Sequence, residues 1–398
     1  MEKWKEYQLK DVTTILGDGL HGTPKYDENG TVFFINGNNL VDGKIEIKGS
    51  TKRVAEDEAK KYRKNLNHRT ILVSINGTIG NVAKYDGEAC ILGKSACYFN
   101  VAEDFDLNFI YYVVASQQFK SSITHLATGT TIKNVSLETM RNYSFLAPSK
   151  DEQKRISGIL SSLDAKIELN RRINDNLEQQ AQALFKSWFV DFDPFRDGPF
   201  VDSELGKIPQ GWKVAELGEV TKQQIEKVGP RTAVKVLSPI TTGELVLSEE
   251  YFTKQVFSES IAKYIIVKPN QFAYNPARIN IGSIGRNTFE FDGCVSPVYV
   301  VFECEKEYHC FFDFVRKTEA FKQEVVSRAI GGVRQTLGYK DFALIKIVYP
   351  PHNVVREFNA LYTNLLNLQN HNNFEIKTLS ALRDTLLPKL MAGEINVE

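Results

Sequence analysis

The sequence has no long hydrophobic run and no ordered spacing of cysteines. None of its stretches approaches the ~20 consecutive apolar residues of a membrane span. The opening Met1-Glu2-Lys3-Trp4-Lys5 lacks the apolar segment of a secretion signal. The five cysteines are an odd number without any Cys-x-x-Cys pair, which argues against a disulfide framework and a zinc site. We therefore expect a cytoplasmic protein without membrane contact, in which the cysteines are small core residues.

An excess of charge of one sign is also missing. The chain has 49 basic and 49 acidic residues, so its formal net charge is zero. A protein that coats nucleic acid through bulk charge is therefore not indicated. If DNA is the partner, the positive charge must be local.

Patterns typical of catalysis are scarce. The six histidines are scattered without metal-ligand spacing. No Asn-Pro-Pro-Tyr or Asp-Pro-Pro-Tyr run is present to hold a flipped base. The stretch Gly17-Asp18-Gly19-Leu20-His21-Gly22 matches a dinucleotide loop, but Pro24 prevents the helix that such a loop needs. Recognition is thus favoured over catalysis, and no cofactor or metal is expected in this chain.

The chain does contain an internal duplication. Phe119-Lys120 returns as Phe321-Lys322 and Pro148 returns as Pro350, each displaced by 202 residues, whereas Trp4-Lys5 returns as Trp212-Lys213, displaced by 208. A period this long indicates two full domains rather than a solenoid. Each copy begins with short alternating apolar runs and turns, which predict a mostly β module with a few helices.

A long helix is predicted at the end of each copy. From Asp151 to about Val190 there is no proline, and apolar residues recur in alternating steps of four and three. This pattern predicts one helix of roughly 38 residues, or ~57 Å, and it returns after Pro351. The predicted pairing positions are Ile156, Leu160, Leu163, Ile167, Asn170, Asn174, Leu177, Leu184 and Trp188 in the first helix, and Phe358, Tyr362, Leu365, Gln369, Asn372, Ile376, Leu379 and Leu386 in the second.

The two helices are expected to cover each other's apolar stripes. An antiparallel pair brings Asn170 and Asn174 near Gln369 and Asn372, and a buried amide pair fixes the register. The alternative is that each helix lies on its own β module, but ~57 Å exceeds what one such module can cover. We predict an α+β chain with pseudo-twofold symmetry and an intramolecular antiparallel coiled coil. Its parts are a module (1–150), a helix (151–192), a connector (193–211), a second module (212–351) and a second helix (352–398).

Several stretches together resemble the specificity subunit of Type I restriction-modification systems. They are DEQKRI at 151–156, ALFKSWFVDFDP at 183–194, SELGKIPQGW at 203–212, GTPKY at 22–26 and GTIG at 77–80. The resemblance implies two target-recognition domains that each read one half of a split DNA sequence, and two spacer helices that set the gap. It also implies catalysis by partners: two modification subunits that bind S-adenosylmethionine, and motor-nuclease restriction subunits that use ATP and Mg.

Base-reading residues are expected on loops between strands, because side chains must reach base edges in the grooves. The candidates are Lys25, Asn36, Asn38, Asn76, Thr78, Lys94, Thr130, Thr131 and Lys133 in the first module, and Arg278, Asn280, Ser283, Arg286, Arg334 and Gln335 in the second. Arg prefers guanine and Asn or Gln prefers adenine, so two different half-sites are predicted, about one DNA turn (~34 Å) apart. The alternative for each residue is that it only caps a turn.

Two further questions stay open at this level. The basic run Lys60-Lys61-Tyr62-Arg63-Lys64 is either a phosphate clamp or a solvated helix face, because Glu56, Asp57 and Glu58 stand at helical spacing from it. A stand-alone DNA methyltransferase or nuclease, and a coiled-coil structural protein, are the rival function classes.

Overall fold

The computed structural model describes residues 4–395 and 397, except 130–132, 253 and 330–335. It divides into two compact units, Met1–Arg172 with Asn372–Glu398, and Ile173–His371. Each unit holds one module together with part of each long helix, α5 (Lys150–Phe189) and α11 (His352–Met391). Among the described residues, no helix is both long and apolar enough to cross a membrane.

The first module is built around a four-stranded sheet in the order β2-β10-β7-β8. Strands β7 and β10 are buried along their whole length, which suits their β-branched and aromatic residues. The module's strands are β1 Lys5–Gln8, β2 Thr13–Asp18, β3 Val32–Ile35, β4 Leu40–Val41, β5 Lys44–Ile45, β6 Arg53–Val54, β7 Thr70–Ser74, β8 Val82–Lys84, β9 Cys90–Leu92, β10 Ala96–Val101 and β11 Ser144–Ala147. Its helices are α1 Glu56–Lys60, α2 Leu107–Ala115, α3 Gln117–His125 and α4 Leu137–Arg141.

The second module repeats this sheet in the order β15-β22-β19-β20. Its strands are β14 Lys213–Glu216, β15 Thr221–Gln224, β16 Lys235–Pro239, β17 Leu245–Leu247, β18 Ile265–Val267, β19 Phe272–Tyr274, β20 Ile284–Arg286, β21 Gly293–Val295, β22 Val300–Cys304 and β23 Lys346–Tyr349. Its helices are α6 Leu217–Val220, α7 Ser248–Tyr251, α8 His309–Val315, α9 Glu319–Arg328 and α10 Tyr339–Phe342. The hairpin of β12 (Phe200–Ser203) and β13 (Gly206–Pro209) precedes this module.

The duplication extends to the details of strand pairing and capping. The terminal strand pair β1-β11 corresponds to β14-β23, and the parallel pair β3-β9 corresponds to β16-β21. Ser116 caps α3 and Thr318, at a displacement of 202, caps α9 in the same way. The fold class predicted from the sequence, two tandem mixed modules with two long pairing helices, is confirmed.

Each end of the helix pair is part of a module's hydrophobic core. Ile156, Leu160 and Leu390 belong to the core of the first unit, together with Phe99 and Phe109 of the first module. In the second unit the helices contribute aromatic side chains to the core, namely Phe185, Trp188, Phe189 and Phe358. Each helix therefore contributes to the core of both modules and pairs with the other helix farther along, so the alternative in which each helix lies on its own module alone is wrong.

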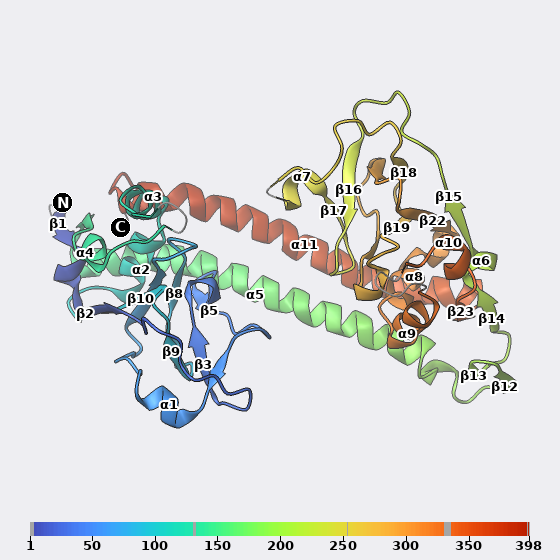
Figure 1. The fold of residues 1–398 in the computed structure, drawn as a ribbon, viewed down its shortest axis with the longest axis horizontal. Helices are drawn as coiled ribbons and strands as arrows, with labels where there is room; N and C mark the ends of the chain where they lie inside the picture. The colour runs from blue at the N-terminus through green and yellow to red at the C-terminus, as the bar shows by residue number, and fades with distance from the viewer. Residues whose placement is uncertain (1–3, 130–132, 253, 330–335, 396, 398) are drawn as a thin grey trace. The chain divides into compact units, whose positions relative to one another are not determined.

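The helices run antiparallel in both units (Figure 1), and the predicted stripe is their less exposed face. In the first unit Asn170, which is 1% exposed, donates its amide to Glu375 at 2.6 Å. In the second unit the amide of Gln369 donates to the backbone carbonyl of Asn174 at 3.2 Å. The expected amide partner of Asn170 is thus replaced by a carboxylate, because Glu375 flanks the stripe and also faces Lys166 at 3.3 Å.

The end of α11 contains a proline. The sequence places Pro388 in the last turn and so predicts an interruption there, but the helix continues to Met391. Proline removes only one backbone hydrogen bond so near a helix end. Gly393 closes the helix with φ +69°, a left-handed conformation that favours glycine.

Candidate nucleic-acid interface

A hairpin loop of the first module carries two of the predicted base-reading residues. This loop, residues 75–81, joins β7 to β8 and exposes Thr78, while Asn76 is half-buried. The amide of Asn76 donates to the side chain of Asn134 at 3.1 Å, and the backbone N–H of Gly77 donates to the carbonyl of Lys133 at 3.3 Å. The loop is therefore held against the segment that precedes α4, which presents the exposed Lys133.

Two further segments join this cluster through Ser95. The backbone N–H of Ile75 donates to the carbonyl of Ser95, and the Ser95 hydroxyl donates to the side chain of Asn36, both at 2.9 Å. Lys94, next to Ser95, is exposed. Asn36, Asn76, Thr78, Lys94 and Lys133 thus come from separate parts of the sequence onto one connected set of loops, which we call the loop cluster.

Other predicted residues of the first module stand outside this set. Asn38 is exposed, and its carbonyl accepts a hydrogen bond from Lys48. Lys25 is exposed on another loop, where its backbone N–H donates to Glu58 of α1 at 2.9 Å. Thr130 and Thr131 lie outside the described residues.

The second module has the same hairpin loop with different side chains. Residues 275–283 join β19 to β20, and Arg278 and Asn280, both exposed, stand at the positions of Asn76 and Thr78 after a displacement of 202. Gly80 and Gly282 occupy equivalent places, with φ of +83° and +93°, so both loops make a turn that glycine adopts without strain. The two loops share the same glycine turn in their backbone and differ in the side chains that they expose.

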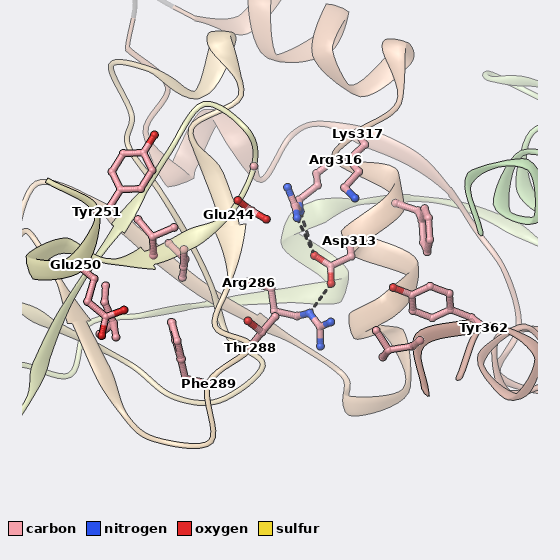
Figure 2. A pocket seen from close by; sticks show the side chains of 16 residues that line it. Glu244, Glu250, Tyr251, Arg286, Thr288, Phe289, Asp313, Arg316, Lys317 and Tyr362 are labelled. Atoms are coloured by element: carbon pink, nitrogen blue, oxygen red, sulfur yellow. Dashed lines mark hydrogen bonds and ion pairs between the residues drawn. The ribbon is translucent and has the colours of Figure 1, made fainter. Parts of the chain in front are cut away.

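Ser283 and Arg286 have internal partners. Ser283 is 2% exposed and donates its hydroxyl to the carbonyl of Pro239 at 2.7 Å. Figure 2 shows Arg286 and Arg316 both directed at Asp313, beside a cavity of about 500 Å³. Burial lowers the pKa of Arg286, but the charge of Asp313 outweighs it and the net shift is upward. Neither side chain is free to reach a base, so we leave both out of the proposed interface; Arg334 and Gln335 lie outside the described residues.

Two asparagine side chains that hold these loops by hydrogen bonds were not among the residues predicted from the sequence. Asn134 holds Asn76, and in the second module Asn275 donates its amide to the Tyr299 hydroxyl at 3.3 Å. Asn134 stands directly before a buried valine and Asn275 directly after a buried strand. A position next to an apolar residue is the sequence signal that could have identified these two residues.

The basic run begins at Lys60, the last residue of α1, and continues beyond the helix, so it is not a helix face, but three of its side chains pair with acidic residues of α1. Lys60 pairs with Asp57 at 3.0 Å and Lys61 with Glu58 at 2.7 Å, and Arg63 pairs with Glu56 at 2.8 Å. The acidic partners neutralise most of the positive charge that a phosphate clamp would need.

The cysteines and acidic residues form no metal-binding group in the described part of the chain, where no three His, Cys, Asp or Glu side chains are placed to hold an ion. The five thiols are free, and three of them are buried. Burial raises the pKa of Cys90 and of Cys294 to about 12 each. These two thiols are therefore protonated at neutral pH and suit a packing role.

The fold and the loop clusters define a class of protein with two repeated recognition modules mounted on an antiparallel helix pair. The family profile described as "Type I restriction modification DNA specificity domain" matches residues 1–179. The MjaIX specificity subunit of Methanocaldococcus jannaschii is 26% identical, over 99% of this chain and 94% of its own length. The HindI specificity subunit of Haemophilus influenzae is also 26% identical, over 99% of this chain and 100% of its own length.

A solved structure has the same fold. The S subunit of a Type I restriction-modification system from M. genitalium superimposes with a TM-score of 0.57 and 18% identity, covering 98% of this chain and 96% of that one. The chain is thus similar to specificity subunits of Type I restriction-modification systems, over residues 1–179 to the family profile and over nearly its whole length to the two relatives.

Proposed function

We infer that this chain is the DNA-reading subunit of a Type I restriction-modification enzyme, and that it recognises a target in two parts. One observation supports this most directly: both modules present the same hairpin loop, with Asn76 and Thr78 in one and Arg278 and Asn280 in the other. Equivalent positions with different hydrogen-bonding groups suit two readers of different sequences. A stand-alone methyltransferase or nuclease is not favoured.

The side chains of the loops divide by chemistry into two roles. Arg278 can donate two hydrogen bonds to guanine, and Asn76 and Asn280 can pair with the edge of adenine in the major groove. Lys94 and Lys133 flank the first loop and suit contacts with phosphates, which hold position without reading sequence. Lys25 and Asn38 are candidates for additional contacts beyond the loop cluster.

Catalysis is assigned to partner subunits. The proposed enzyme contains two modification subunits that bind S-adenosylmethionine, together with restriction subunits that use ATP and Mg. This chain positions them on double-stranded DNA in the cytoplasm and transfers no methyl group itself. The similarity of this chain to specificity subunits supports this assignment.

Single substitutions in the two loops test the proposal. The variants Asn76→Ala and Arg278→Ala are assembled with the modification subunits, and methylation is mapped on a randomised DNA library. Loss of a good bidentate contact costs about 1–3 kcal/mol, or roughly 5- to 150-fold in selectivity at one base position. Arg278→Ala should relax one position of one half-site, and Asn76→Ala should relax the other half-site.

A matched control distinguishes reading from general charge. Lys60→Ala removes a basic residue that already has the acidic partner Asp57, so both half-sites should keep their selectivity. Unchanged base preferences in the Asn76 and Arg278 variants, or equal relaxation of both half-sites by one substitution, would contradict the assignment.

A further inference from the structure

A small polar cluster joins three elements of the first unit. Asp164 of α5 accepts the hydroxyl of Tyr112 from α2 at 2.6 Å on one carboxylate oxygen, and Arg383 of α11 at 2.9 Å on the other. Tyr112 is 4% exposed, and the side chains of Asp164 and Arg383 are each 32% exposed. One carboxylate therefore links the module to both helices.

The cluster belongs to a polar stripe along α5 that contacts the first module and, at Asp164, also α11. Gln153 and Ser157, each 2% exposed, bond to Asp106 at the start of α2, at 3.0 and 2.7 Å. One turn beyond Asp164, Glu168 pairs with Lys44, and Arg171 pairs with Asp42 at 3.0 Å. The module is thus attached to α5 by directed hydrogen bonds over about five turns of helix.

At the three positions that correspond to this cluster the second unit has apolar side chains, although other polar contacts, such as Lys317 with Glu178 at 3.2 Å and Asn359 with the carbonyl of Glu307 at 2.7 Å, also join its module to the helices. At a displacement of 202, Phe314 replaces Tyr112 and Leu366 replaces Asp164, and Ala181 stands in the place that corresponds to Arg383. Phe314 packs against Phe185 and Tyr362, with ring centroids 5.1 Å apart in both cases. Apolar contact therefore serves at these positions in the second unit, and the polar cluster at the same positions of the first unit requires another explanation.

Directed bonds restrict rotation and sliding more than apolar contact does. A carboxylate accepts its two donors at limited angles, so Asp164 fixes how α2 is turned about α5. Burial, followed by the bond to Asp164, raises the pKa of Tyr112, which keeps its hydroxyl protonated and able to donate. Burial lowers the pKa of Arg383, but its bonds to Asp164 and Asp384 outweigh that effect, so the guanidinium stays charged.

We propose that Tyr112, Asp164 and Arg383 are positioning residues that hold the first module in one orientation on its helix pair. Resting on the proposed function, the inference is that this orientation determines how strictly the enzyme measures the gap between its two half-sites. Buried polar groups are not needed for stability, since apolar residues can replace them at little or no cost. Their contribution here is to select one geometry.

The test transplants the residues of the second unit into the first. The triple variant Tyr112→Phe, Asp164→Leu, Arg383→Ala removes all three members of the cluster together, and the one outside partner that loses a bond, Asp384, is 65% exposed and stays solvated. Its thermal midpoint should therefore equal or exceed that of the wild type. Nitroxide labels at Lys64→Cys and Lys377→Cys, both exposed and both in the first unit, report the orientation. The distance distribution between them should broaden in the triple variant.

Gap discrimination is measured on DNA whose two half-sites are separated by the native gap or by one base pair more or less. Assembled with its modification subunits, the wild-type chain should prefer the native gap by about tenfold or more, because a wrong gap forces the DNA to twist and stretch. The triple variant should prefer it by about threefold or less. Lys154→Ala, on an exposed face of the same helix, serves as the control and should behave like the wild type.

A triple variant that folds, keeps the narrow distance distribution and discriminates gaps like the wild type overturns the proposal. If the triple variant fails to fold, Tyr112→Phe removes a single hydroxyl and decides the question by the same two measurements. If the wild-type complex modifies no two-part target, the proposed function fails, while the distance distributions still show whether the cluster fixes the orientation.

Discussion

Lengthening the helix pair should lengthen the unread gap in the DNA target. The perturbation is an insertion of four helix-forming residues after Asn170, where the helices face each other through Asn170 and Glu375. Because α11 runs antiparallel to α5, an insertion in α5 alone would shift the stripes out of register. Four matching residues are therefore inserted after Asn372.

The size of the effect follows from helix geometry. Four residues add about 6 Å of helix at ~1.5 Å per residue. This corresponds to one or two base pairs at ~3.4 Å each. Four residues also turn the helix by about 40° beyond a full turn, which the DNA can absorb by a small change of twist. The modified motif should thus keep both half-sites and gain one or two unread base pairs.

The assay is long-read methylation sequencing of DNA modified by the wild-type and lengthened complexes. Four residues inserted after Leu205, in the exposed turn between β12 and β13, serve as a control and should leave the gap unchanged. A methylation map with new half-site bases and an unchanged gap would refute the idea that the helix pair sets the spacing.

Three shorter predictions concern partners, catalysis and pH. Replacing Leu177, which is 6% exposed, and Leu184 by Asp should abolish co-purification with the modification subunits, because two carboxylates would then disrupt the helix pair; retained stoichiometric binding would argue against the helices as the assembly hub. Purified chain incubated with labelled S-adenosylmethionine and DNA should show no incorporation, and a signal that persists in highly purified chain would restore the methyltransferase alternative. Burial raises the pKa of Glu178, but bonds from Gln182 and Lys317 outweigh it and the net shift is downward. The stabilisation from this carboxylate is therefore complete above its ordinary pKa of 4.5 and is lost as the pH falls through the lower folded-state value. The difference in melting temperature between the wild type and Glu178→Gln, small for so exposed a pair, should shrink as the pH is lowered below 4.5. A difference that stays constant over that range would exclude this carboxylate as its source.

The sequence determined much of the fold. The duplication and the alternating steps of four and three are properties of the chain itself, and both depend on local rules. A 3.6-residue period places every third or fourth residue on one face, so the apolar stripe can be read without knowing what covers it. Glycines that require positive φ, such as Gly80 and Gly282, likewise mark their turns locally.

Partners that come from distant parts of the chain could not be read in this way. Asn36, Asn76, Lys94 and Lys133 were selected one by one as polar loop residues, and only the strand pairing brings their loops together. The same strand pairing gives Ser283 a hydrogen-bond partner and Arg286 an ion-pair partner inside the module, and no local sequence pattern predicts either.

The polar stripe of α5 shows most clearly the difference between what the sequence determines and what the tertiary structure determines. Gln153, Ser157 and Asp164 appear in the sequence as the hydrophilic face of an amphipathic helix, and burial by the first module gives them their partners. Helical periodicity fixes which residues share a face. Only the packing of other elements against that face decides whether it meets water, a second helix or a module, because that contact depends on residues far away in the chain.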